Sequence, residues 1–323
     1  MIHFDQVSKT FAASQRPAVD RITLHVKQGN ICVFVGPSGC GKTTILRMIN
    51  RLVTPDGGTI TIDGRSIMQM DPPALRRTIG YVIQQVGLLP HRTIAQNIAL
   101  VPELLKWPRD KTEKRVLELI EMMGLDPSEV GHKYPHQLSG GQAQRVGVAR
   151  ALAADPPIML MDEPFAAVDP IVRLRLQDEF LRLQQTVQKT ICFVTHDINE
   201  AIKLGDYLVV LKEGRLVQTG TPIEILTQPE DDFVLSLLGD DRGVKILDLT
   251  RAETLMEPFE NRLGPIKSNG HRVQSIDPVK IALEMMMQKN TDEILVCKGT
   301  RPVGILRWPA IKTHVNRISG GTV

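Results

Sequence analysis

The sequence is poor in aromatic residues and contains no long apolar run. Aromatic residues make up 4% of the chain, whereas 42% is hydrophobic and 23% is charged, a composition typical of a globular protein. No run of about 18 apolar residues is present, so we expect no segment to span a bilayer. The first residues also lack the pattern of a secretory signal peptide. We therefore expect any membrane association to come through a partner protein.

Paired cysteines and a strong net charge are lacking as well. The cysteines occur singly and form no CxxC motif, so we expect reduced thiols in a cytoplasmic protein. They are Cys32, Cys40, Cys192 and Cys297. The formal net charge of +3 is too small to indicate nucleic acid or an anionic membrane surface as a partner. A length of 323 residues suits two domains, one of them large.

A glycine-rich stretch, residues 36–43, follows the apolar run 31–35 and precedes the helix-patterned run 45–49. A strand, a glycine-rich loop and a helix in this order predict a loop whose backbone N–H groups bind phosphate. Lys42 is then expected to reach the β- and γ-phosphates, and the Thr43 hydroxyl to bind Mg²⁺. We predict a site for a nucleoside triphosphate; the alternative is an ordinary glycine-rich turn.

Hydrophobic patterns predict the rest of the large domain. Short alternating runs indicate strands at 2–4, 22–26, 59–64 and 81–83. Continuous apolar runs indicate buried strands at 158–161 and 190–194, and a hairpin is expected over 207–219. Helical periodicity covers about 93–154 and 174–183. Strands that alternate with helices favour an α/β fold with a parallel core and an inserted helical subdomain at about 86–155.

The pattern changes after about residue 239. Residues 240–243 resemble a linker, and a helix is expected to start at Asp277-Pro278. Two strands, 293–297 and 303–306, then follow. We predict a large domain over residues 1–238 and a small α+β domain over residues 239–323.

Three further polar motifs follow the predicted elements. Ser139 precedes two glycines at a helix start, which is either a second anion-binding helix terminus or a simple capped helix. Asp162 and Glu163 end a buried strand, where they suit Mg²⁺ binding and water activation; the alternative is a solvated strand end. His196 follows another buried strand and lies either beside the γ-phosphate or in a core or capping position.

In their order and spacing these motifs, together with Gln84 and Asp169, resemble the ATPase subunits of ATP-binding-cassette (ABC) transporters. The resemblance covers residues 1 to about 238. It implies a P-loop NTPase cassette that binds and hydrolyses ATP with Mg²⁺. It also implies a head-to-tail dimer, in which the phosphate loop of one copy and residues 139–142 of the second copy enclose each ATP.

The resemblance implies roles for individual residues. Glu163 is expected to be the catalytic base, assisted by His196, Gln84 and Lys42, and Mg²⁺ is expected on Thr43, Gln84 and Asp162. The expected nucleotide contacts are Phe11, Gly36, Ser38, Gly39, Cys40, Gly41, Lys42, Thr43, Thr44, Ser139, Gly140, Gly141, Gln142 and Asp169. Phe11 is expected to stack on adenine, with a core phenylalanine as the alternative. Ala166 stands where the family more often has serine, so that hydroxyl is absent here.

Finer segments resemble one branch of the family, the importers of quaternary-amine osmoprotectants such as glycine betaine, choline and carnitine. These segments are 88–93, 134–142, 145–157 and 162–170. The branch implies transmembrane permease subunits as partners, docking near Gln84 and residues 86–97, and an extracytoplasmic solute-binding protein that acts indirectly. No nucleic acid partner is expected. The expected location is the cytoplasmic face of the inner membrane, reached through the permease.

The small domain resembles one motif of a cystathionine-β-synthase-type (CBS) regulatory module. In that module, a hydroxyl and a carboxylate after the strand glycine contact adenosine ligands, but Gly304 is followed by Ile305, Leu306 and then Arg307 to Ala310. We therefore expect dimerisation or sensing of ionic strength rather than nucleotide sensing, with an inert remnant as the alternative.

Three other functions remain open. The first is an importer ATPase for another small polar solute, such as an amino acid. The second is a soluble, non-transport ATPase of the superfamily, which usually has two fused cassettes or a long coiled-coil insertion, and neither is present here. The third is a regulatory protein that holds ATP without turnover, and the presence of both Glu163 and His196 argues against it.

Overall fold

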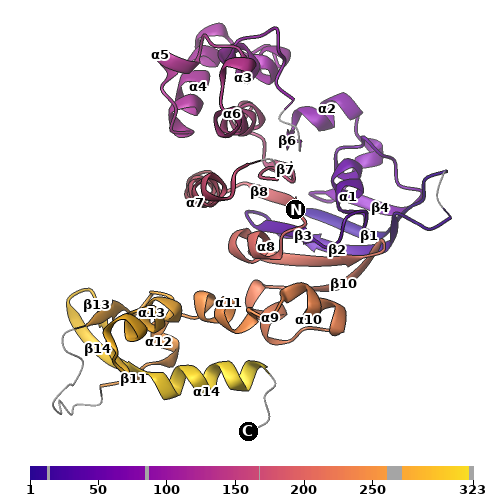
Figure 1. Ribbon diagram of the computed structural model, residues 1–323. Helices are drawn as coiled ribbons and strands as arrows, with labels where there is room; N and C mark the ends of the chain where they lie inside the picture. The colour runs from indigo at the N-terminus through magenta and orange to yellow at the C-terminus, as the bar shows by residue number, and fades with distance from the viewer. Residues whose placement is uncertain (13–14, 84–86, 167, 260–270, 320–323) are drawn as a thin grey trace. The chain divides into compact units, whose positions relative to one another are not determined.

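The computed structural model describes the chain apart from residues 13–14, 84–86, 167, 260–270 and 320–323 (Figure 1). The chain forms two compact units, Met1–Pro222 and Ile223–Val323. Each unit has a hydrophobic core of its own. The functional domain limits expected from the sequence, 1–238 and 239–323, stay a prediction. Within the described residues, every helix is too short or too polar to cross a membrane.

A mostly parallel sheet forms the centre of the first unit. Its strand order is β10-β9-β3-β8-β7-β6, and only β10 is antiparallel to its neighbour. The strands are β3 (Ile31–Val35), β6 (Ile79–Val82), β7 (Ile158–Asp162), β8 (Thr190–Thr195), β9 (Tyr207–Lys212) and β10 (Arg215–Gly220). Every residue of β3, β7 and β8 is buried, which explains their continuous apolar runs. The predicted strands and the hairpin of this sheet are confirmed.

The register of this sheet brings the functional segments to one edge. Val35 at the end of β3 pairs with Thr195 at the end of β8, and Asp162 at the end of β7 pairs with Val194. Because these strands are parallel, the segments that follow them leave the sheet side by side. In α/β sheets the carboxyl edge of the strands is where ligands bind.

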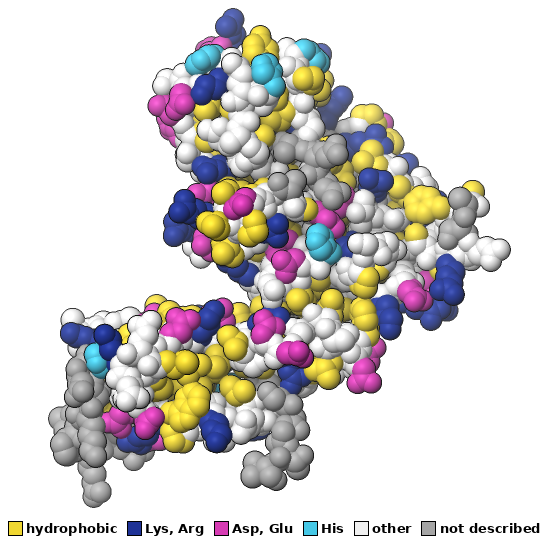
Figure 2. Space-filling model, in the orientation of Figure 1, with side chains coloured by type: hydrophobic (Ala, Val, Ile, Leu, Met, Phe, Trp, Pro, Cys, Tyr) yellow, Lys and Arg dark blue, Asp and Glu magenta, His cyan; other side chains and the backbone are white. Residues whose placement is uncertain are grey.

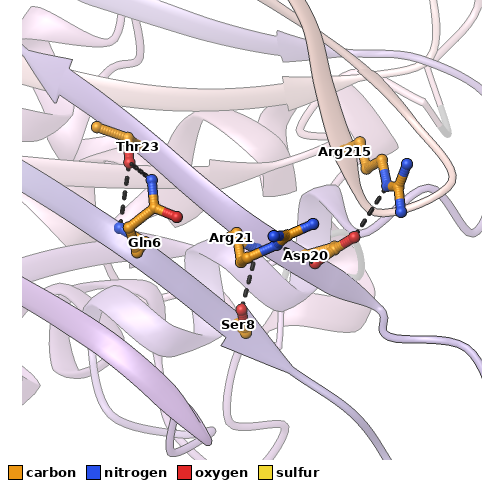
Figure 3. Close-up of polar contacts among 6 residues, drawn as sticks. All are labelled: Gln6, Ser8, Asp20, Arg21, Thr23 and Arg215. Carbon is orange, nitrogen blue, oxygen red and sulfur yellow. Dashed lines mark hydrogen bonds and ion pairs between the residues drawn. The ribbon is translucent and has the colours of Figure 1, made fainter.

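A second, antiparallel sheet has the order β2-β1-β4-β5. Its strands are β1 (Ile2–Lys9), β2 (Val19–Val26), β4 (Gly57–Ile62) and β5 (Arg65–Ser66). The β1–β2 register shifts twice, and side chains replace ladder bonds there. Thr23 Oγ1 accepts from Gln6 N and Nε2 at 3.1 and 2.8 Å, and Ser8 Oγ accepts from Arg21 N at 2.9 Å (Figure 3).

Asp20 links this second sheet to the β9–β10 hairpin. Its carboxylate accepts from Arg215 Nε at 2.9 Å (Figure 3). Its backbone N–H donates to Gly214 O at 2.8 Å. Partial desolvation opposes ionisation, but hydrogen bonds from Arg215 and Arg21 lower the pKa of Asp20. The hairpin that packs against the phosphate loop is therefore held to the second sheet.

Eight α-helices and two short 3-10 helices, Ile67–Gln69 and Pro135–Gln137, are described in the first unit. The α-helices are α1 (Lys42–Ile49), α2 (Pro72–Arg77), α3 (Ile94–Leu104), α4 (Arg109–Met122), α5 (Pro127–Val130), α6 (Gly140–Leu152), α7 (Pro170–Val187) and α8 (Ile198–Leu204). Helices α3 to α6 cluster together as the predicted helical segment (Figure 1). Apolar side chains of α4 on one face, Val116, Leu119 and Ile120, are buried.

The second unit surrounds a sheet of order β11-β14-β13-β12. Its strands are β11 (Glu257–Pro258), β12 (Arg272–Gln274), β13 (Glu293–Lys298) and β14 (Arg301–Arg307). Its helices are α9 (Pro222–Thr227), α10 (Asp232–Leu238), α11 (Arg242–Leu249), α12 (Ala252–Leu255), α13 (Val279–Lys289) and α14 (Trp308–Ser319). The helix predicted to start at Asp277-Pro278 is confirmed as α13, and both predicted strands are confirmed.

One prediction for this region is wrong for two of its four residues. Residues 240–243 were expected to be a linker, but Arg242 and Gly243 form the first turn of α11. The helix forms because it buries Ile246 and Leu247, and because the Lys245 ammonium binds the Asp241 carboxylate at 2.6 Å beside its N-terminus. A polar first turn therefore belongs to an amphipathic helix.

The surface and the cysteines agree with the composition. Acidic and basic side chains are interspersed over the face seen in Figure 2, and the formal net charge is +3. All four cysteines are free and buried.

Candidate functional site

The loop between β3 and α1 is tightly packed at two of its glycines. Gly36 and Gly41 have φ angles of 152° and 105°. A Cβ at Gly36 would lie 2.2 Å from Leu211 O, and one at Gly41 would lie 2.3 Å from Ala18 O. A side chain at either position would collide with backbone, so the loop geometry requires glycine there. Gly39 also has a positive φ of 79°, but its surroundings are open.

Lys42 is the buried cation of this loop. Lys42 is the first residue of α1 and is 5% exposed. Its ammonium donates to Gly36 O at 2.7 Å and to Pro37 O at 2.9 Å, and it lies 3.8 Å from Cys40 Sγ. The positive charge is therefore held at the centre of the curled loop, where an anion would meet both the ammonium and the N-terminus of α1.

Thr43 and Asp162 bring two oxygen donors together beside the loop. The Thr43 hydroxyl donates to Asp162 Oδ1 at 2.8 Å. Asp162 is 6% exposed, and this burial raises the pKa of its carboxyl despite the hydrogen bond from Thr43 and the positive charge of Arg47. A buried carboxylate of this kind has unused capacity for a cation. No cluster of three or more His, Cys, Asp or Glu suited to a metal is found among the described residues.

Glu163 and His196 form the next pair along the sheet edge. Glu163 Oε2 lies 3.1 Å from His196 Nδ1. The Glu163 side chain is 19% exposed, whereas that of His196 is 57% exposed, so His196 is not a core residue. Glu163 adopts a φ of 46° and is fixed by a hydrogen bond from its N–H to Val194 O. Left-handed backbone at a non-glycine residue costs about 1–3 kcal/mol and is concentrated at functional sites.

The second predicted anion-binding terminus is the start of α6, where Ser139 and Gln142 hydrogen-bond to each other. Ser139 caps α6, with its Oγ accepting from Gln142 N at 3.3 Å, while Gln142 Oε1 accepts from Ser139 N at 3.0 Å. Ser139 and Gly140 are exposed. Ser139 is thus an N-cap, as both interpretations of this motif require, and anion binding at the exposed helix terminus stays a prediction. Asp169 caps α7 through Ile171 N at 2.9 Å.

The structure places the remaining predicted residues around this edge. Phe11 is 42% exposed, so the alternative of a core phenylalanine is wrong. Lys9 Nζ lies 5.6 Å from the centre of the Phe11 ring. Ser38 is exposed, Cys40 is buried and Thr44 is half-buried. Gln84 lies outside the described residues.

The sequence analysis did not single out a buried acid close to His196. Glu200 in α8 is 6% exposed and accepts from Gln177 Nε2 at 3.0 Å. Its neighbours Ala201, Ile202 and Leu204 are also buried. A carboxylate within such an apolar helix face is unusual unless it is paired, and that pattern is a usable sequence signal.

Comparison with known proteins agrees with this geometry. The family profile described as ABC transporter matches residues 19–166. The chain is 50% identical over 297 residues, 92% of its length and 75% of the relative's, to the glycine betaine/carnitine/choline transport ATP-binding protein OpuCA of Bacillus subtilis (strain 168). It is also 50% identical over 255 residues, 78% of this chain and 67% of the relative, to the osmoprotectant import ATP-binding protein OsmV of Salmonella typhimurium.

A solved structure shares the fold. It is described as the dimeric, post-hydrolysis state of an ATP-binding cassette bound to ADP and Pi, and it superposes with a TM-score of 0.62 at 34% identity. The match covers 69% of this chain and 99% of that one. The fold class and the family inferred from the sequence motifs are thereby confirmed, whereas the CBS-like character of the second unit stays a prediction. The chain is a nucleotide-binding ATPase cassette and belongs to the ABC transporter family.

Proposed function

We propose that this chain is the ATP-hydrolysing subunit of an importer for a quaternary-amine osmoprotectant, such as glycine betaine, carnitine or choline. The observation that carries the proposal is the 50% identity, over 92% of the chain, to a protein named for transport of these three solutes. A relative named for choline transport, 48% identical over 303 residues, supports the same solute class. The site residues of the cassette suit a nucleotide and carry no information on the solute. The solute class therefore rests on sequence identity to these relatives.

ATP with Mg²⁺ is the proposed ligand, and the residues fit both. Backbone N–H groups of the curled loop 36–43 would bind phosphate, and Lys42 adds a fixed positive charge. Thr43 and Asp162 would hold Mg²⁺, with Gln84 as the third residue expected from the sequence; oxygen atoms are the ligands that Mg²⁺ prefers. When bound, Mg²⁺ supplies charge neutralisation on the β- and γ-phosphate oxygens.

Glu163 and His196 are the proposed residues for water activation. Glu163 orients the attacking water and accepts its proton, and its carboxylate is kept in place by the contact with His196 Nδ1 at 3.1 Å. Lys42 stabilises the negative charge that develops on the transferred phosphoryl group. Phe11, exposed at the end of β1, would stack on the adenine.

A second copy of the chain is proposed to complete each site. The exposed terminus of α6, with Ser139 to Gln142, would bind the γ-phosphate held by the partner's loop, and Asp169 would lie at the dimer interface. The related cassette described as a dimer bound to ADP and Pi supports this arrangement. Ala166 lacks a hydroxyl, so this position would contribute only backbone.

The remaining partners follow from the importer assignment. We infer permease subunits that dock on the segment after Gln84 and near residues 86–97, with a solute-binding protein acting through the permease. The chain would then lie at the cytoplasmic face of the cell membrane. The region after residue 238 would act as a CBS-like module for dimerisation or for sensing ionic strength.

Two other functions compete with this proposal. One is an importer ATPase for a different small polar solute, such as an amino acid, because the cassette itself does not contact the solute. The other is a soluble ATPase unconnected to transport. Uptake by whole cells distinguishes the osmoprotectant importer from both alternatives.

The experiment measures uptake of labelled glycine betaine, choline, carnitine and proline in cells that lack this chain. The cells are complemented with the wild type, with Glu163→Gln, or with the matched surface control Glu179→Gln, whose side chain is 46% exposed. We expect the wild type and the control to restore uptake of a quaternary amine, most strongly after an osmotic upshift, and Glu163→Gln to restore none.

Each other outcome has a definite meaning. Restored uptake of proline alone would point to an amino-acid importer, and no change for any solute would refute the osmoprotectant assignment. Full uptake by Glu163→Gln would refute the role of Glu163 as the base. In purified protein, Glu163→Gln should bind ATP and remain an ATP-bound dimer without turnover.

A further inference from the structure

Glu200 occupies the centre of a hydrogen-bond network behind His196. Its carboxylate accepts from Gln177 Nε2 at 3.0 Å and from the hydroxyl of Thr195. The Thr195 Oγ1 atom in turn accepts from Asp197 N at 3.0 Å. The residues on both sides of His196 are thus linked, through one hydroxyl, to a carboxylate that is 6% exposed.

His196 itself has little packing that would fix its position. Its side chain is 57% exposed, and its imidazole Nδ1 lies 3.1 Å from Glu163 Oε2. The position of an exposed imidazole therefore depends on how firmly the flanking residues fix its backbone. Thr195, buried at the end of β8, and Asp197, which caps α8, provide that backbone position.

Helix α7 contributes to this network twice along its length. Gln177 binds Glu200, and Arg173, one turn earlier, donates to Val168 O at 3.0 Å and lies 4.0 Å from Asp197 Oδ2. Since α7 starts directly after Asp169, the network also connects the segment after Glu163 to the turn that carries His196.

The space between these groups is too small for a ligand. A cavity of about 30 Å³ is lined by Glu163, Arg173, Thr195, His196, Asp197, Glu200 and two neighbours. That is about the volume of one water molecule. The arrangement therefore serves to fix positions and does not form a second binding site.

We propose that Glu200 is a positioning residue for ATP hydrolysis: through Thr195 it fixes the turn that carries His196, and so fixes the contact of His196 with Glu163. The inference rests on the proposed function of Glu163 and His196. Burial raises the pKa of the Glu200 carboxyl, although hydrogen bonds from Thr195 and Gln177 oppose the shift. A glutamine at this position offers the same acceptor without the buried charge.

The test compares Glu200→Ala with Glu200→Gln in the purified full-length chain, with kcat and KM for ATP measured by release of radiolabelled phosphate. We expect Glu200→Ala to lower kcat by about tenfold to a hundredfold with little change in KM, because a small displacement of a catalytic group has this effect. Glu200→Gln should retain most of the wild-type kcat.

A matched control lies on the same helix. Lys203 also joins α8 to α7, through Asp178 at 2.8 Å, but at the surface and away from His196. Lys203→Ala should leave kcat unchanged. Should Glu200→Ala not fold, Gln177→Leu removes one of the two hydrogen bonds at nearly constant volume and should lower kcat by a smaller factor.

The decisive readout is a double-mutant cycle with His196→Ala. If Glu200 acts through His196, Glu200→Ala should lower the residual rate of His196→Ala by less than about twofold. An equal fold-loss in both backgrounds, or an unchanged kcat in Glu200→Ala, would overturn the inference. If His196→Ala and Glu163→Gln themselves keep full turnover, the proposed catalytic site fails instead, which separates the two hypotheses.

Discussion

A methyl group added at Gly41 should damage the phosphate loop far more than one added at Gly39. Both residues have a positive φ, 105° for Gly41 and 79° for Gly39, so alanine is disfavoured by the backbone at both. The space around them differs. A Cβ at Gly41 would lie 2.3 Å from Ala18 O, whereas nothing lies within 4 Å of a Cβ at Gly39.

The expected free energies follow from this difference. The left-handed conformation costs an L-residue about 1–2 kcal/mol, which is the whole expected loss for Gly39→Ala. In Gly41→Ala the distance from the new Cβ to Ala18 O must grow by at least about 0.7 Å to reach an ordinary contact. Ala18 resists this movement because its N–H donates to Lys9 O at 2.8 Å. Overpacking of this kind typically costs a further ~1–3 kcal/mol, so about 2–5 kcal/mol is expected in total.

The assay is urea unfolding followed by tryptophan fluorescence. The chain has two tryptophans, Trp107 in the first unit and Trp308 in the second, so a Trp308→Phe host reports on the first unit alone. The free energies of unfolding of Gly41→Ala and Gly39→Ala are compared in that host at constant slope. Equal losses for the two variants would refute the steric argument, and a larger loss for Gly39→Ala would refute the description of the loop.

Two other changes test the electrostatics. Because burial raises the pKa of Asp162, its proton stabilises the folded chain at low pH, and this stabilisation is lost as the pH rises above 3.8 through the raised folded-state pKa. Asp162→Asn, which keeps an acceptor for Thr43, should therefore raise the melting temperature measured without nucleotide at neutral pH, with a smaller gain near pH 4; a lower melting temperature at neutral pH would contradict this. Burial also raises the pKa of Cys192 to about 12 and that of Cys32 well above its usual value. Both thiols should react with a thiol reagent only after unfolding in urea, and fast labelling of the native chain at either one would show that the core opens.

The sequence predicted the elements whose stability comes from continuous apolar burial. The strands β3, β7 and β8 are buried along their whole length, so their composition alone identifies them. The phosphate loop was predictable because its glycines and Lys42 follow such a strand. The polar residues at the ends of β7 and β8 then had to meet at one sheet edge.

The sequence did not predict structure that depends on buried polar groups. Helix α7 was expected over 174–183 but extends from Pro170 to Val187. Gln184 is 8% exposed because it donates to Gly29 O at 3.1 Å and to Lys189 O at 2.6 Å. Such partners are distant in sequence, so a hydrophobic pattern cannot reveal them, and the same limit hid the contact of Gln177 with Glu200.

The contacts of Lys42 have a consequence for the choice of anion. Its ammonium donates to two carbonyls of its own loop, Gly36 O and Pro37 O, so an incoming phosphate competes with those carbonyls for the same hydrogens. Affinity then depends on the difference between two sets of hydrogen bonds: those to phosphate join two ionised groups, whereas those to the carbonyls have one ionised partner. A triphosphate, which gains several such bonds along the loop, overcomes this competition more easily than a single inorganic phosphate does. The contacts of Lys42 with its own loop should therefore lower the affinity for free phosphate more than the affinity for the nucleotide.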